Sequence, residues 1–299
     1  MTFDNIYGHD GIKQTLNTAI DNNTVSHAYV FCGKKGIGKT TMATAFAQLL
    51  THNSVADIIV VTNEHYDVKE KKALSVDAIR AARTDIYIKP YIADKKVFII
   101  PDADTMSAGA QNALLKVLEE PPAYCVIILI SANDRVLLPT ILSRAVILRF
   151  APLDDGIISQ YIKDKYKDSI DSILIRLCSG SLSIADELIT TDGLRESIGE
   201  YAALFKRFVG ADKACIYEAI AFFEQQKQNC FMFFDIMSIL LSDSLIEKSQ
   251  TNGMKGINKG AALKIINNIA IAKNAINQNR NYGIVISELL LDAWRALHD

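Results

Sequence analysis

The sequence predicts an α/β domain with a buried parallel sheet, followed by segments that are entirely helical. Short apolar runs alternate with amphipathic stretches up to about residue 150, and one of these runs leads directly into a glycine-rich loop. After Pro152 the β-like runs disappear. Such alternation is typical of α/β folds, in which helices cover both faces of the sheet and the strands therefore read as continuous apolar runs.

Five apolar runs are predicted as strands of the first domain. They are HAYVF at 27–31, DIIVV at 57–61, KVFII at 96–100, CVIILI at 125–130 and VILRF at 146–150. Each run is short, as buried strands of a parallel sheet usually are. Between the first two lies TMATAFAQLL at 41–50, which is rich in helix-forming residues and predicts a helix.

Beyond Pro152 the chain reads as helices separated by Gly, Ser and Asn residues. A domain boundary is therefore expected near residue 151. A small helical bundle is predicted at 152–192 and several longer amphipathic helices at 193–299. We interpret the aromatic residues at 222–223 and 231–234 as helix core.

Composition excludes some classes of partner. The formal net charge of −2 gives no overall attraction to nucleic acid, so contact with DNA requires a local basic patch or partner chains. The lysine-rich clusters at 69–72 and 95–96 are interpreted as solvated faces. No apolar run approaches the ~18 residues of a membrane span, and the N-terminus does not resemble a signal peptide. We expect a cytoplasmic protein without a membrane partner.

Residues 33–40, GKKGIGKT, match the phosphate-binding pattern G-x-x-x-x-G-K-[ST] between a predicted strand and a predicted helix, as the motif requires. Glycines allow the loop to direct backbone N–H groups at phosphate oxygens, and the helix N-terminus adds its positive dipole end. The lysine is expected to reach the β- and γ-phosphates, and the threonine after it to bind Mg²⁺. The predicted ATP-binding residues of this loop are Gly33, Gly36, Gly38, Lys39, Thr40 and Thr41.

A P-loop hydrolase also needs a carboxylate for Mg²⁺, and often a second one to orient water, at the end of a neighbouring strand. Here the strand at 96–100 continues as Pro101-Asp102-Ala103-Asp104. Either Asp102 binds the metal and Ala103 replaces the second acid, or Pro101 replaces the metal-binding acid. Both registers predict little or no ATP hydrolysis by the chain alone. The alternative is that Asp102 and Asp104 are helix-capping or turn residues.

Three longer strings resemble the bacterial clamp-loader AAA+ family. They are SHAYVF at 26–31, NALLKVLEEPP at 112–122 and LPTILSR at 138–144. Together with similar segments at 3–9 and 74–80, the resemblance covers nearly all of residues 1–150. It implies an AAA+ P-loop nucleotide-binding domain at 1–151, a small helical lid at 152–192 and an all-α collar for oligomerisation at 193–299.

At two positions the chain departs from the family pattern, and in both it resembles the non-motor, delta-prime type of subunit rather than the tau/gamma motor type. The family's spacing from Asn112 favours the register in which Pro101 replaces the metal-binding acid. The lid of this family commonly carries Gly-Ser-x-Arg, but here Ser183 stands at the arginine position. The chain length and the segments at 279–281 and 287–291 also resemble this type.

The resemblance assigns a role in trans to Arg144, which stands where the family extends an arginine finger to ATP on a neighbouring subunit. A guanidinium there stabilises the charge that develops in phosphoryl transfer. Ser131 and Asn133 fall where such proteins sense the γ-phosphate, the alternative being turn residues that satisfy backbone groups. The implied partners are tau/gamma and delta subunits and, through the complex, a sliding clamp and primed DNA.

Zinc is not predicted. Many relatives carry four metal-binding cysteines between the P-loop and the acidic motif, but the stretch at 51–58 contains none. The five cysteines of the chain stand far apart, without the spacing of a zinc site, and are interpreted as reduced core thiols. The competing hypothesis for the whole chain is an autonomous P-loop ATPase, or a tau/gamma-type motor subunit, that uses Asp102 with Mg²⁺.

Overall fold

The computed structural model describes residues 3–69, 73–168, 171–210, 214–245 and 257–298. The chain divides into two compact units. The N-terminal unit comprises Met1–Ser169 and Ser179–Ile184, and the C-terminal unit comprises Ile170–Cys178 and Ala185–Asp299. The predicted three-domain division, with boundaries near 151 and 192, stays a prediction.

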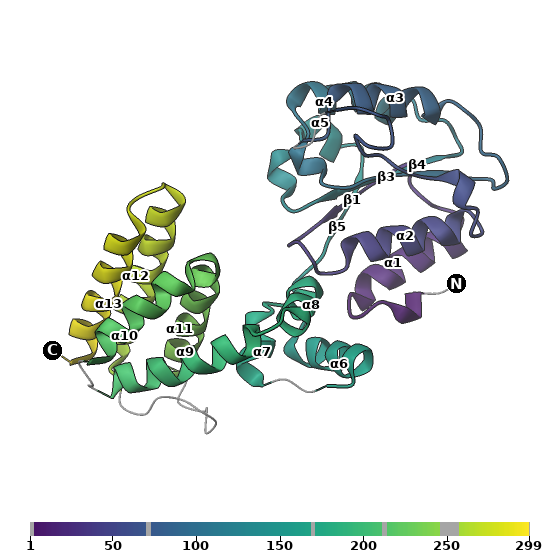
Figure 1. Cartoon of the computed structure of the whole chain (residues 1–299). Coiled ribbons are helices and arrows are strands. Elements are labelled where there is room, and N and C mark those ends of the chain that lie inside the picture. The colour runs from purple at the N-terminus through teal and green to yellow at the C-terminus, as the bar shows by residue number, and fades with distance from the viewer. Residues whose placement is uncertain (1–2, 70–72, 169–170, 211–213, 246–256, 299) are drawn as a thin grey trace. The chain divides into compact units, whose positions relative to one another are not determined.

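A parallel sheet of five strands forms the centre of the N-terminal unit, in the order β2-β3-β4-β1-β5 (Figure 1). The strands are β1 (Ala28–Cys32), β2 (Ile58–Val60), β3 (Lys96–Ile100), β4 (Cys125–Ser131) and β5 (Val146–Arg149). Val30 of β1 pairs with Leu129 of β4 and with Ile147 of β5. Each strand coincides with one predicted run to within about a residue or two at its ends, so the predicted α/β fold class is confirmed.

Helices cover both faces of this sheet. They are α1 (Asp10–Asp21), α2 (Lys39–Leu50), α3 (Val76–Ile86), α4 (Ala108–Glu119) and α5 (Pro139–Leu142). Helix α6 (Asp155–Tyr166) belongs to the same unit but contributes to neither core of the sheet. Figure 1 shows α3, α4 and α5 on one face and α1 and α2 on the other, where each group closes a separate core. Successive side chains of β4 point to opposite faces of the sheet. Ile127 belongs to the core beneath α3, α4 and α5, and Ile128 belongs to the core beneath α1 and α2.

Short 3-10 helices join several of these elements: η1 (Phe3–Asn5), η2 (Val55–Asp57), η3 (Ala103–Thr105) and η4 (Asp134–Val136). Serine side chains cap the N-termini of two of the longer helices. The hydroxyl of Ser75 accepts a hydrogen bond from the amide of Ala78 at the start of α3, and Ser107 caps α4 through Ala110 in the same way.

The C-terminal unit is helical throughout its described residues. Its elements are α7 (Ser172–Leu177), the greater part of α8 (Leu182–Thr190), α9 (Leu194–Val209), α10 (Ala214–Gln225), η5 (Lys227–Asn229), α11 (Cys230–Leu245), α12 (Lys259–Asn277) and α13 (Tyr282–His298). Phe223 and Phe233 pack against Tyr201, and Phe234 packs against Phe223. All three phenylalanines are fully buried, so these members of the predicted aromatic core are confirmed as core.

A buried carboxylate fixes the loop that precedes β3. Asp57 accepts hydrogen bonds from the amides of Tyr91, Ile92 and Ala93 and from the hydroxyl of Ser54. Burial alone would raise the pKa of Asp57, but the four hydrogen bonds together lower it to about 2. The ionised carboxylate therefore serves as the anchor for this loop.

The interpretation of 95–96 as a solvated face is wrong for Lys96, which is only 2% exposed. Its ammonium donates hydrogen bonds to the carbonyl oxygens of Asp85, at 3.0 Å, and Ile88, at 3.3 Å. These carbonyls lie in the last turn of α3 and just after it, where a positive charge is favourable. In the other cluster Lys69 is exposed, and residues 70–72 lie outside the described residues.

All five cysteines are buried and free, which confirms that they belong to the core, while their reduced state stays a prediction. Within the described ranges, no helix is long and apolar enough to cross a membrane.

Candidate nucleotide-binding site

The P-loop connects β1 to α2, as the sequence predicts. Gly36 and Gly38 have φ angles of 79° and 99°, a backbone region that side-chain-bearing residues rarely adopt. Gly38 is also the N-cap of α2, whose first residues are Lys39, Thr40 and Thr41. The loop thus places the free amides of a helix N-terminus at the carboxyl edge of the sheet, an arrangement suited to phosphate.

Lys39 folds back over its own loop. Its ammonium donates hydrogen bonds to the carbonyl oxygens of Gly33, at 2.6 Å, and Lys34, at 2.5 Å, and the residue is 7% exposed. Burial lowers the pKa of Lys39, while the negative charges of Asp104 and Asp102 act in the opposite direction. The hydrogen bonds to Gly33 and Lys34 therefore hold the Lys39 ammonium against its own loop.

The next two residues of the loop border a cavity. Thr40 and Thr41 line it together with Asn5, Ile6 and further residues of α2, and its volume is about 550 Å³. Both threonines are exposed. Their hydroxyl groups are accessible, as binding of a metal or phosphate would require.

The acidic motif has no carboxylate at the end of β3. The strand ends at Ile100 and Pro101 follows it directly, while Asp102 adopts a left-handed conformation with φ 47°. Asp102 occupies the N-cap position of η3, but its side chain makes no capping hydrogen bond. Its carbonyl oxygen instead accepts hydrogen bonds from the amide and the hydroxyl of Thr105. The exposed carboxylate of Asp102 is therefore available to a ligand.

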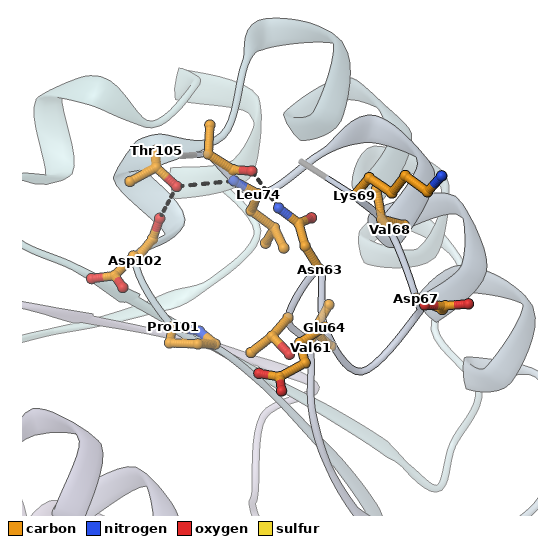
Figure 2. A pocket seen from close by; sticks show the side chains of 12 residues that line it. Val61, Asn63, Glu64, Asp67, Val68, Lys69, Leu74, Pro101, Asp102 and Thr105 are labelled. Carbon is orange, nitrogen blue, oxygen red and sulfur yellow. Dashed lines mark hydrogen bonds between the residues drawn. The ribbon is translucent and has the colours of Figure 1, made fainter. Parts of the chain in front are cut away.

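The other acid of the motif, Asp104, accepts a long hydrogen bond of 3.4 Å from the amide of Ala132. This contact joins the end of β3 to the turn after β4. Beside the motif lies a cavity of about 680 Å³ whose lining includes Pro101, Asp102 and Glu64 (Figure 2).

The side chains of Ser131 and Asn133 form hydrogen bonds within their own turn. The hydroxyl of Ser131 is buried and donates to the carbonyl oxygen of Asn133, and it also accepts from the amide of that residue. The side-chain oxygen of Asn133 accepts from the amide of Arg135 and so caps η4. This geometry fits the turn interpretation, and sensing of a γ-phosphate by either residue stays a prediction.

A feature that sequence reasoning missed is the docking of residues 181–183 on the P-loop. The amides of Leu182 and Ser183 both donate to the carbonyl oxygen of Gly36, at 2.9 and 3.3 Å, and the hydroxyl of Ser181 donates to the carbonyl oxygen of Lys35. A Cβ added to Gly36 would lie 2.3 Å from the Ser181 hydroxyl oxygen. The start of α8 therefore rests directly on the loop.

Arg144 lies between α5 and β5. Its guanidinium donates hydrogen bonds to the carbonyl oxygen of Thr140 and the hydroxyl of Ser143, and it forms an ion pair with Glu119, whose Oε1 lies 3.0 Å from Nη2. The Arg144 side chain is 35% exposed. Its contacts lie with α4 and α5 and not with the P-loop of its own chain.

Residues 8–154 match the family described as "DNA polymerase III, delta subunit". The match covers nearly all of the α/β domain that carries the P-loop. This domain belongs to the clamp-loader AAA+ family.

Proteins similar to this clamp-loader AAA+ domain include two from Bacillus subtilis (strain 168). DNA polymerase III subunit tau is 35% identical over 195 residues, which cover 61% of this chain and 34% of tau. DNA polymerase III subunit delta' is 27% identical over 214 residues, which cover 65% of this chain and 63% of delta'. The chain thus spans about a third of the length of tau.

One solved structure extends the likeness in fold to nearly the whole chain. A DNA polymerase III, gamma subunit-related protein from Thermotoga maritima superimposes with a TM-score of 0.53 at 18% identity, covering 95% of this chain and 99% of the other. At this identity the likeness concerns the fold alone.

Sequence reasoning also missed Gln111, a buried amide of the clamp-loader AAA+ domain. Its Nε2 donates to the carbonyl oxygens of Met106 and Val136, and its Oε1 accepts from the amide of Leu138. The sequence does carry a signal for this role, because Gln111 is a polar residue on the apolar face of α4, and buried polar groups are normally hydrogen-bonded. Gln111 ties α4 to the segment that leads toward Arg144.

Proposed function

We propose that this chain is a delta-prime-like, non-motor subunit of the DNA polymerase III clamp loader. In this proposal it joins tau/gamma and delta subunits in the cytoplasm and helps to load a sliding clamp on primed DNA. The observation that carries the proposal is the end of β3, where Pro101 occupies the first position after the strand. Proline offers no ligand to Mg²⁺, so a nucleotide bound here lacks that contact.

The chain's own P-loop is proposed to bind ATP weakly. Backbone amides at the start of α2, together with Lys39 and the Thr40 hydroxyl, would hold the phosphates and a Mg²⁺ ion, which supplies charge neutralisation when bound. Two features oppose tight binding. The Lys39 ammonium is already hydrogen-bonded to loop carbonyl groups, and Ser183 lacks the positive charge of the family's arginine.

Arg144 is proposed to act on the ATP of a neighbouring subunit. A guanidinium has five N–H groups on three nitrogens, and the hydrogen bonds to Thr140 and Ser143 both come from Nη1, while Nη2 lies in the ion pair with Glu119. N–H groups of Nε and Nη2 would donate to the oxygens of a phosphate. Removal of such a finger reduces phosphoryl transfer by about 10³–10⁵-fold in systems where it has been measured.

A second candidate, a tau/gamma-type motor or an autonomous ATPase, is favoured by the intact P-loop and by the 35% identity to tau. Steady-state phosphate release by the purified chain separates the two candidates. The non-motor proposal expects background turnover that Asp102→Asn does not alter. Motor-like turnover that Asp102→Asn abolishes would overturn it.

The complementary measurement uses the chain with its cognate tau/gamma and delta subunits. We expect the assembled complex to hydrolyse ATP and load the clamp, with this activity dependent on the presence of this chain. A complex whose ATPase and clamp loading are the same without this chain would contradict the proposal.

A further inference from the structure

We propose that Glu119 is a positioning residue for Arg144: its carboxylate pairs with the guanidinium and fixes its orientation, so that the remaining N–H groups face the neighbour's phosphate. The inference rests on the proposed finger role of Arg144. It adds a residue that the finger motif itself does not contain, because Glu119 belongs to the end of α4.

The first support is the geometry of the ion pair. Glu119 Oε1 and Arg144 Nη2 are 3.0 Å apart, and their side chains are 51% and 35% exposed, respectively. An isolated pair at such exposure contributes little to stability, with a usual range of about 0–1 kcal/mol. Its contribution to stability is thus too small to be its main effect, whereas a fixed guanidinium orientation has a direct use in phosphoryl transfer.

The second support is the number of constraints on the guanidinium. Nη1 donates to both the Thr140 carbonyl oxygen and the Ser143 hydroxyl, and Nη2 forms the ion pair with Glu119. The first two partners lie on the same short segment as Arg144. Among the polar partners that Arg144 has within the described residues, only Glu119 comes from a different element, so this ion pair relates the guanidinium to the body of the domain.

The third support is that α4 is itself firmly placed relative to the Arg144 segment. Gln111, two turns before Glu119 on α4, is 3% exposed and binds the backbone of Val136 and Leu138. Helix α4 therefore holds this segment at two places, by an amide near its start and by a carboxylate at its end. Loss of Glu119 removes the second contact and leaves the first, so the fold should survive.

The test measures ATP hydrolysis by the assembled complex. Glu119→Ala is expected to lower kcat by about 10–100-fold at nearly constant KM, because a misplaced catalytic group costs about that much. Glu119→Gln, which keeps an oxygen acceptor, should lose less activity. The matched control is Glu120→Ala, since the adjacent Glu120 is exposed and makes no ion pair within the described residues, and it should behave as wild type.

A double mutant separates positioning from a structural role. If Glu119 acts through Arg144, Glu119→Ala should cause no further loss in an Arg144→Ala background. Additive losses would overturn the inference, and so would wild-type activity of Glu119→Ala in a complex that Arg144→Ala inactivates. Full activity of Arg144→Ala would instead overturn the finger role itself, and with it this inference.

A spectroscopic measurement on the free chain needs no partner. The side-chain N–H resonances of Arg144 should show a restrained guanidinium in the wild type and in Glu120→Ala. In Glu119→Ala they should show rapid rotation, and an unchanged spectrum would contradict the inference.

Discussion

The ammonium group of Lys39 donates a hydrogen bond to the carbonyl oxygen of Gly33 across 2.6 Å. The P-loop thereby supplies its own acceptors for the charge that a triphosphate would otherwise neutralise. Any nucleotide that binds here must exchange these contacts for contacts with phosphate, at a cost in free energy.

Lys39→Ala tests this site directly. We expect ATP binding to the free chain to be weak and to weaken at least about tenfold further in the variant, because a charge-assisted hydrogen bond contributes about 1.5–3 kcal/mol. Calorimetric titration with ATP and Mg²⁺ measures both affinities. Lys34→Ala is the control, since it keeps the backbone carbonyl and removes only an exposed side chain. Equal affinities of wild type and Lys39→Ala would exclude the P-loop as the binding element.

Arg144→Ala is expected to leave assembly with the partner subunits intact and to reduce ATPase activity of the complex by about 10³-fold or more. Arg144→Lys should restore little, because an ammonium cannot reproduce the planar fork of a guanidinium. Size-exclusion chromatography checks assembly, and phosphate release checks turnover. Arg135→Ala, which removes another exposed arginine nearby, should be neutral. Normal turnover by Arg144→Ala complexes would refute the finger.

Gly36→Ala tests the docking of residues 181–183. The new methyl group would lie 2.3 Å from the Ser181 hydroxyl oxygen, and the φ of 79° would be strained for alanine. We expect the N-terminal unit to lose about 1–3 kcal/mol of stability. Gly11→Ala is the control, because nothing lies within 4 Å of the added Cβ. Denaturant unfolding of both variants makes the comparison, and equal stability would show that the contact is absent in solution.

Asp57→Asn tests the buried carboxylate and has a defined pH dependence. The folded-state pKa of about 2 lies below the ordinary value of 3.8, so the carboxylate stabilises the fold above about pH 4. This stabilisation is lost as the pH falls from about 4 to 2. At pH 7 the variant should be less stable by about 1–3 kcal/mol, since its amide cannot satisfy all the donors.

The measurement is urea unfolding at a series of pH values. The difference in free energy of unfolding between wild type and Asp57→Asn should shrink as the pH approaches 2. A constant difference across the series would show that ionisation of Asp57 does not contribute.

The sheet, the P-loop and the buried aromatic residues were predictable because they depend on local patterns. Apolar runs of strand length and glycines at fixed spacing can be read without knowing the fold. Lys96 was not predictable, since Lys95 beside it stays partly exposed and only the packing of α3 decides which lysine is buried.

The contacts around the site depend on pairs that are remote in sequence. Ser181 and Lys35 are 146 residues apart, and no local pattern relates them. Glu119 belongs to a string that the family resemblance includes, but its contact with Arg144 follows from the crossing of α4 and α5. Such partners become visible only when the chain is folded.

The two hydrogen bonds from residues 182–183 to Gly36 join main-chain atoms. Every amino acid except proline offers the same N–H group, so substitution at these two positions need not loosen the contact. The two hydrogen bonds therefore do not depend on whether residue 183 is this serine or the arginine that the family commonly carries.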